Sequence, residues 1–254
     1  MRALLRDTAS LYWFGMHEAM NNRAWIVLGL GQPVMWLVLF GPLLGSVRGP
    51  GLGTDDDQLS LFVPGLLMMV ALFGSMFMGL GLLANLRCGM LERLAATPVS
   101  RFALLTGAIL RDVTLLFAQA VLLLAVGAAM GMRADPAGTV LTLGLVLLVG
   151  MLGAATSYGL ALVLREESTL AGAVNVLTMP LALVSGLLLP ISLAPGWLHA
   201  IARADPLYYG VEGARHAMAG NLGDTPVPVG FGVTGTLIVV VALWVTPKFR
   251  KGIV

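Results

Sequence analysis

The sequence predicts an all-α integral membrane protein with six transmembrane helices, and three observations lead to this prediction. The composition is 58% hydrophobic and only 11% charged, with a mean hydropathy of +0.91, whereas soluble domains contain about 25% charged residues. Apolar runs long enough to cross a bilayer recur along the chain. Basic residues gather in alternate segments between these runs. We therefore expect residues 1–254 to form a single transmembrane domain.

The apolar runs have the length that a helix needs to cross about 30 Å of hydrocarbon at about 1.5 Å per residue. The third apolar pattern begins at Phe102, so its first two turns are expected in the cytoplasmic interface, where Arg111 reaches the headgroups and Asp112 stays in contact with water. Pro180 is expected to kink the fifth span. We place the six spans at about 25–44, 61–84, 111–131, 139–163, 169–189 and 229–246.

The distribution of basic residues predicts that both termini are cytoplasmic. With this orientation four basic residues lie in outer segments, and they are Arg48, Arg133, Arg203 and Arg215. The other eleven lie in cytoplasmic segments, and they are Arg2, Arg6, Arg23, Arg87, Arg93, Arg101, Arg111, Arg165, Lys248, Arg250 and Lys251. Because the excess of Lys and Arg marks the cytoplasmic side, segment 85–101 is placed there too.

Residues 2–22 are predicted to form an amphipathic helix that lies in the membrane interface before the first span. A frayed polar terminus is the alternative. One face of the predicted helix is mostly apolar and consists of Leu4, Thr8, Leu11, Tyr12, Gly15, Met16 and Ala19. The opposite face is polar and consists of Arg6, Ser10, His17 and Asn21, with Trp13 and Phe14 flanking it.

Two short helices are predicted after the fifth span, in the outer segment. The second has Asp205 as its N-cap, Pro206 at its first helical position and Gly220 just past its end. Both helices are too short to cross a bilayer. We therefore expect residues 190–220 to form a re-entrant or surface-lying helical hairpin.

Several functions are disfavoured by the residues that the chain lacks. A phosphate-binding Walker loop needs a lysine after its glycines, and both lysines, Lys248 and Lys251, lie in the last residues of the sequence. The single cysteine and three histidines cannot make a Cys-rich metal site, and a net charge of +2 does not suggest nucleic acid. No carboxylate falls in the apolar centre of a predicted span, which disfavours an ion-driven carrier. We predict no catalytic, cofactor-binding or metal-binding residue in this chain.

The segment "MLERLAATPVSR", residues 90–101, lies on the predicted cytoplasmic side between two spans. It has the pattern of a two-turn helix that ends at Thr97, because the residue before Pro98 avoids the helical region. Ser100 is suited to cap the next helix. A short rigid helix held between two spans is suited to contact a partner and to pass its movement to the membrane helices. An ordinary interfacial loop helix is the alternative.

This segment resembles the cytoplasmic signature of type-2 ABC exporter permeases, in which Leu-Glu-x-Leu leads into Thr-Pro-Val-Ser-Arg. A second stretch, residues 174–215, is similar to the fifth span of that family, followed by a Pro-x-Trp-Leu turn and an Asp-Pro-Leu segment. The subgroup that the chain resembles most is the daunorubicin-resistance type, with nodulation lipo-oligosaccharide exporters as near relatives.

The resemblance implies a coupling helix at about 89–97 that docks on a separate ABC ATP-binding subunit, which binds ATP and Mg²⁺. The permease would not be catalytic by itself. A second permease copy, identical or related, would complete the exporter in a bacterial cytoplasmic membrane. The family usually has an acidic, arginine-rich run where this chain has residues 85–90. The resemblance therefore does not indicate which charge pairs hold the ATPase. The residues implied to contact the ATPase are Leu91, Glu92, Arg93, Leu94, Thr97 and Pro98.

The predicted function is export of amphipathic, drug-like or lipid-like cargo. Within transport, the alternative cargo is a lipid-linked saccharide or cell-envelope lipid. From another class, the chain could be a membrane anchor that recruits an ATPase without translocation. A stand-alone membrane enzyme would need polar residues clustered at one depth, and the sequence shows no such cluster.

Overall fold

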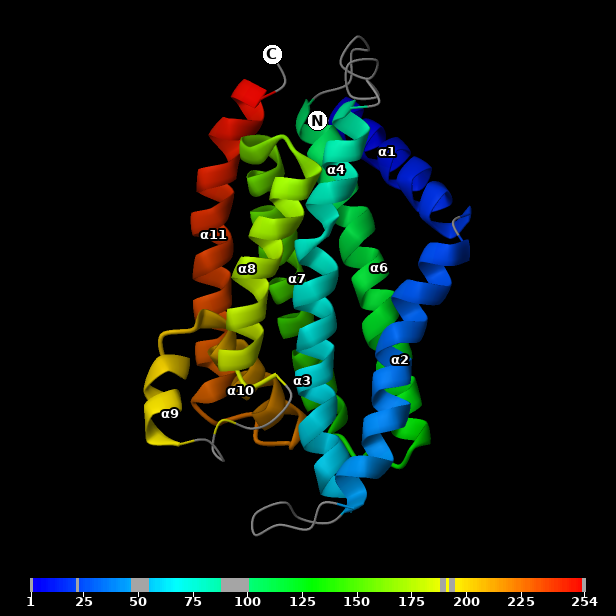
Figure 1. Cartoon of the computed structure of the whole chain (residues 1–254). Helices are drawn as coiled ribbons and strands as arrows, with labels where there is room; N and C mark the ends of the chain where they lie inside the picture. Colours follow the sequence, from blue (N-terminus) through cyan, green and yellow to red (C-terminus); the bar gives the residue numbers. More distant parts are fainter. Residues whose placement is uncertain are drawn as a thin grey trace.

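The computed structural model describes residues 2–21, 23–46, 55–87, 101–187, 191 and 195–252. Within these ranges every regular element is an α-helix, in agreement with the all-α prediction. The long helices stand side by side and run alternately up and down the bundle (Figure 1). The elements are α1 (Arg2–Asn21), α2 (Arg23–Ser46), α3 (Asp55–Met76), α4 (Met78–Arg87), α6 (Arg101–Ala129), α7 (Pro136–Leu164), α8 (Glu167–Val184), α9 (Gly196–Ala202), α10 (Pro206–Met218) and α11 (Pro226–Gly252).

Five segments of the described chain are long and apolar enough to cross a membrane, and they coincide with the second to sixth predicted spans. The predicted first span, 25–44, falls within α2, whose apolar stretch Gly31–Gly41 is by itself too short to cross. The count of six therefore stays a prediction. The five segments are Leu59–Ala84, Thr106–Ala129, Pro136–Leu164, Glu167–Val184 and Pro226–Pro247.

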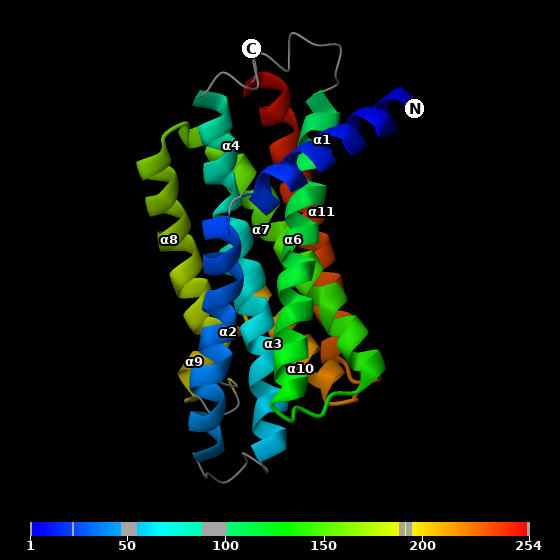
Figure 2. The ribbon, with the colours of Figure 1, turned by 90° about the vertical axis from the view of Figure 1, so that its right-hand side faces the viewer.

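The helix α7 is the centre of the bundle, since it contacts α3, α4, α6, α8, α10 and α11. Leu145, Val146 and Val149 of this helix are fully buried, as are Leu66 and Leu67 of α3. The helices α8 and α11 bury the smallest share of their apolar segments, and Figures 1 and 2 show them at the periphery. Their exposed faces are suited to lipid or to another protein chain.

Small residues let the neighbours of α7 approach its backbone. A Cβ atom at Gly138 would overlap the carbonyl oxygen of Ala217 in α10, and one at Gly153 would overlap the hydroxyl of Ser75 in α3. Close approach over glycine is a common way of packing membrane helices, because lipid supplies no hydrophobic force between them. The bundle therefore depends on side-chain size at these positions.

The two ends of the bundle carry different elements. The start of α1, the end of α4, the start of α6 and the end of α11 lie at one end (Figures 1 and 2). The helices α9 and α10 and the α6–α7 connection lie at the other end. We call the second end the cap end. This arrangement agrees with the alternation from which the cytoplasmic placement of the termini was predicted, and the placement itself stays a prediction.

Replacing Gly138 with alanine is expected to lower the melting temperature in detergent, because the added methyl group meets backbone rather than a movable side chain. Overpacking of this kind costs about 1–3 kcal/mol. Gly172→Ala is the matched control, since no atom lies within 4 Å of its Cβ position. Equal melting temperatures for the two variants, measured by tryptophan fluorescence, would contradict the packing described for α7 and α10.

Candidate functional site

The predicted coupling helix, 89–97, lies outside the described residues, and so do the six residues implied to contact an ATPase: Leu91, Glu92, Arg93, Leu94, Thr97 and Pro98. The structure describes the helices that bracket this segment. Helix α4 ends at Arg87 and α6 begins at Arg101, both at the end of the bundle opposite the cap end (Figure 1). Any force on the segment would therefore reach the bundle through α4 and α6.

Helix α1 crosses the first turns of α6 at the same end of the bundle and extends away from it (Figure 2). The Tyr12 hydroxyl donates to the Thr114 hydroxyl at 3.4 Å, and the hydroxyls of Thr8 and Thr106 lie 3.4 Å apart. The two helices approach closely at Gly107, where an added Cβ would lie 3.3 Å from the Thr8 carbonyl oxygen. The crossing places α1 against the helix that follows segment 88–100.

The two predicted faces of α1 are confirmed wherever side chains are described. Gly15 and Met16 are buried against the bundle. Trp13 and Phe14 are 68% and 57% exposed, as is expected of large apolar rings that anchor a helix in a membrane interface. The predicted polar face is exposed at Arg6, Ser10, His17 and Asn21.

The prediction that Asp112 stays in contact with water is wrong. This carboxylate is only 3% exposed. Oδ1 accepts from Nε of Arg111 at 2.9 Å and lies 2.7 Å from its Nη2, while the Tyr158 hydroxyl of α7 donates to Oδ2. Pairing with a guanidinium and a hydroxyl is the usual condition for burying a carboxylate. The group ties α6 to α7, and no local pattern in the sequence indicates the partner from α7.

The predicted second span, 61–84, is interrupted at Phe77, where α3 ends and α4 begins. The Leu80 amide donates to the Phe77 carbonyl oxygen at 3.1 Å, the short spacing of a 3₁₀ turn. The Ser157 hydroxyl of α7 donates to the Met76 carbonyl oxygen and accepts from the Gly79 amide at 2.9 Å. One side chain from α7 thus satisfies two backbone groups at the interruption.

The two short helices predicted after the fifth span are present as α9 and α10. Asp205 is the N-cap of α10, since its Oδ1 accepts from the Leu207 amide at 2.9 Å. Gly220 follows the end of the helix at φ +84°, as the predicted end required. Re-entry of this hairpin into the membrane stays a prediction.

Burial changes the electrostatics of the Asp205 cap. Asp205 is 5% exposed, and its Oδ2 has no hydrogen-bond partner among the described residues. Desolvation raises the pKa of Asp205 to about 6, against the opposing effect of the Leu207 amide. In the folded protein the protonated form of Asp205 therefore predominates below a pH of about 6.

Arg215 of α10 joins three helices, a role that the sequence did not reveal. It is 4% exposed. Its Nη2 donates to the carbonyl oxygen of Gly186 at 2.6 Å and its Nε to that of Leu61 at 3.3 Å, while Glu212 lies 3.4 Å from Nη1. Burial lowers the pKa of Arg215 and Glu212 opposes that effect. The guanidinium thus links the end of α8 and the start of the second span to α10.

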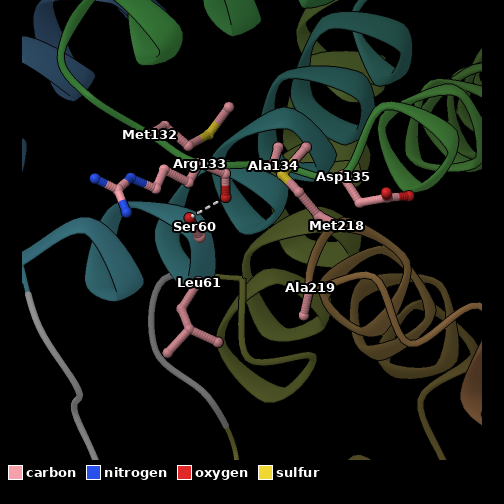
Figure 3. Close-up of a pocket in the computed structure, with 8 residues that line it drawn as sticks. All are labelled: Ser60, Leu61, Met132, Arg133, Ala134, Asp135, Met218 and Ala219. Carbon is pink, nitrogen blue, oxygen red and sulfur yellow. Dashed lines mark hydrogen bonds between the residues drawn. The ribbon is translucent and has the colours of Figure 1, made fainter.

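A cavity of about 640 Å³ opens at the cap end, between the start of α3, the α6–α7 connection and the end of α10 (Figure 3). The Ser60 hydroxyl donates to the Arg133 carbonyl oxygen at 2.9 Å and holds two walls together. The volume lies in the range of small-molecule sites. The lining combines apolar and polar residues, namely Ser60, Leu61, Met132, Arg133, Ala134, Asp135, Met218 and Ala219.

Comparison with known proteins gives a match between residues 7–219 and the ABC-2 type transporter family. This chain belongs to that family. It is 31% identical over 192 residues to the putative transport permease ycf38 of Cyanophora paradoxa, a match that covers 75% of this chain and 66% of that protein. It is 25% identical over 214 residues to the daunorubicin resistance ABC transporter permease protein DrrB1 of Streptomyces coeruleorubidus, covering 83% and 74% of the two chains.

A further relative, the probable doxorubicin resistance ABC transporter permease protein DrrC of Mycobacterium tuberculosis, is 25% identical over 191 residues, covering 74% of this chain and 68% of that protein. The chain thus spans about two thirds to three quarters of the length of these relatives. This ABC-2 permease is a multi-pass membrane protein and a transmembrane component of an ABC transporter.

Replacing Asp205 with asparagine is expected to alter the pH dependence of the permease's stability. In the folded protein the pKa of Asp205 is about 6, above the ordinary value of 3.8. This carboxyl group therefore binds a proton more tightly in the folded state than in the unfolded state. The stability of wild type thus falls as the pH rises from about 4 to about 7. Asparagine keeps the cap acceptor without the charge. Melting temperatures measured from pH 4 to 8 should show a smaller fall for Asp205→Asn, and an unchanged slope would contradict the burial of this carboxylate.

Replacing Arg215 with methionine is expected to destabilise the permease strongly, because it leaves buried carbonyl oxygens and Glu212 without their partner. Removing one member of a buried ion pair costs about 3 kcal/mol or more. Arg203→Met is the control, since Arg203 is exposed at the same end of the bundle. Thermal unfolding in detergent should show a clear loss for Arg215→Met alone. Equal losses would show that charge, and not the buried contacts, matters.

Proposed function

We propose that this permease is the translocation subunit of an ATP-driven exporter that moves amphipathic, drug-like or lipid-like cargo outward. The observation that carries the proposal is the family match over residues 7–219. Two of the relatives are named for resistance to daunorubicin and doxorubicin, both as ABC transporter permeases. ATP and Mg²⁺ would bind to a separate ATP-binding subunit, and hydrolysis would take place there.

The end of the bundle opposite the cap end is the proposed docking side for the ATP-binding subunit. Segment 88–100 connects α4 to α6 there, and α1 crosses α6 beside it. A partner that engages residues 89–97 would thus also lie close to α1. Eleven of the fifteen basic residues belong to segments predicted on this side, which supports its cytoplasmic location. The proposed setting is a bacterial cytoplasmic membrane with both termini inside.

A second permease copy would complete the pathway, because a single bundle has a packed core around α7. The peripheral apolar faces of α8 and α11 are available for such pairing or for lipid. The cavity at the cap end has methionine and leucine beside polar groups (Figure 3). Methionine adapts its shape to varied apolar ligands, so this mixed lining supports an amphipathic cargo.

The test is co-purification with the ATP-binding subunit encoded by the neighbouring gene. Leu94→Asp should reduce recovery of that subunit about tenfold or more, because a charge is placed in the apolar contact proposed for the coupling helix. Leu222→Asp is the matched control, since this half-exposed leucine follows α10 at the cap end. Equal recovery with wild type and Leu94→Asp would contradict the docking site, and no recovery with wild type would contradict the exporter proposal.

A further inference from the structure

The interruption of the second span has an unusual hydrogen-bond arrangement. In a continuous α-helix each amide donates to the carbonyl oxygen four residues earlier, so Leu80 would donate to Met76 and Gly79 to Ser75. Here the Leu80 amide donates to Phe77, and the Ser157 hydroxyl bonds both the Met76 oxygen and the Gly79 amide. The side chain of another helix therefore takes positions that the helix ladder would fill.

The surroundings of Ser157 exclude other partners and hold the two helices close together. Ser157 is fully buried, with 0% exposure. A Cβ atom at Gly79 would meet the Ser157 hydroxyl and carbonyl oxygen, and one at Gly153 would meet the hydroxyl of Ser75. Unpaired backbone groups are costly inside a membrane, and serine side chains are known substitutes for a broken ladder. Here, Ser157 is placed to stabilise the interrupted form over a straight helix.

Helix α4 is a short segment between this interruption and segment 88–100. It has ten residues, and its main contacts are with α7 and α8. Kinks at side-chain insertions are places where a helix bends without breaking further hydrogen bonds. Movement imposed on segment 88–100 would thus tilt α4 about Phe77 before it tilted the 22 residues of α3.

We propose that Ser157 is a positioning residue that keeps the second span divided at Phe77, so that α4 moves as a separate segment together with the ATPase-facing segment. This proposal rests on the proposed function, because it concerns how ATP-driven movement enters the bundle. The role of Ser157 is to position helices rather than to bind cargo or ATP, since Ser157 is fully buried and its hydroxyl bonds the backbone of Met76 and Gly79. Its hydroxyl sets the balance between a divided span and a continuous one.

The experiment measures the ATP-dependent movement of α4 in the full complex. Spin labels are placed at Ala84 of α4 and Val163 of α7, both exposed, after replacement of Cys88 by serine. The permease is reconstituted with its ATP-binding subunit in lipid nanodiscs, and label distances are measured without nucleotide and after trapping with ATP and orthovanadate. Wild type should show a change in the distance distribution on trapping.

Ser157→Ala removes both hydrogen bonds and should favour the continuous helix. Loss of a single hydrogen bond shifts a two-state equilibrium roughly five-fold, so the ratio of molecules that move on trapping to molecules that do not should fall at least by that factor. Thr156→Ala is the matched control, because the Thr156 hydroxyl donates to Leu152 within its own helix at 2.8 Å. This control should behave like wild type. If Ser157→Ala does not fold, Ser157→Cys, which keeps the volume and weakens both bonds, decides by the same measurement.

The outcomes separate this proposal from the one on which it rests. If Ser157→Ala retains the ATP-binding subunit and moves like wild type, the proposed role of Ser157 is overturned while the exporter proposal stands. If Thr156→Ala loses the movement equally, the effect belongs to α7 in general and the role of Ser157 is again overturned. If wild type does not bind the ATP-binding subunit, both proposals fail.

Discussion

Every interruption of a membrane helix must be satisfied from within the protein, and this constraint governs the structure. Lipid offers no donors or acceptors to an unpaired amide or carbonyl group. After the end of α8, the Arg215 guanidinium donates to a backbone carbonyl oxygen. At the break at Phe77, the Ser157 hydroxyl bonds one carbonyl oxygen and one amide. At the start of α7, Oδ2 of Asp135 accepts from the Gly138 amide at 2.7 Å. At Phe77 and at the end of α8, the side chain that satisfies the backbone groups comes from another helix, so these polar contacts also join the helices.

The elements that local sequence determines could be predicted. The apolar runs located the second to sixth spans because hydropathy is summed over each segment. The faces of α1 followed from helical periodicity, and the cap at Asp205 followed from the Asp-Pro pair that opens α10. The quoted cytoplasmic and outer stretches correctly indicated the family. The coupling residues, such as Leu91 and Leu94, lie outside the described chain and stay a prediction.

The features that could not be predicted depend on residues far apart in the sequence. The Asp112 carboxylate is paired inside the bundle with Tyr158, 46 positions later, which donates to it. At the break at Phe77, the Met76 carbonyl oxygen accepts from Ser157, 81 positions later. Arg215 reaches a carbonyl group 154 positions earlier. A charge in an apolar sequence indicates cost, but only the tertiary arrangement shows whether a partner offsets it. For this reason Asp112 was wrongly placed in water and Arg215 was counted only as an outer charge.

Helix α10 contacts its neighbours in two different ways, through backbone on one side and through a side chain on the other. Toward α7 and α11 it meets backbone with backbone: a Cβ atom at Gly138 of α7 would overlap the Ala217 carbonyl oxygen, and one at Gly230 of α11 would lie 2.6 Å from that of Tyr209. No layer of side chains can rearrange across these contacts, so α7, α10 and α11 are expected to move as one body. Toward α8 and the start of the second span, α10 is instead joined by hydrogen bonds of the Arg215 side chain, and a side chain can change its rotamer where a backbone contact cannot yield. An opening at the cap end would therefore separate α10 from this second side.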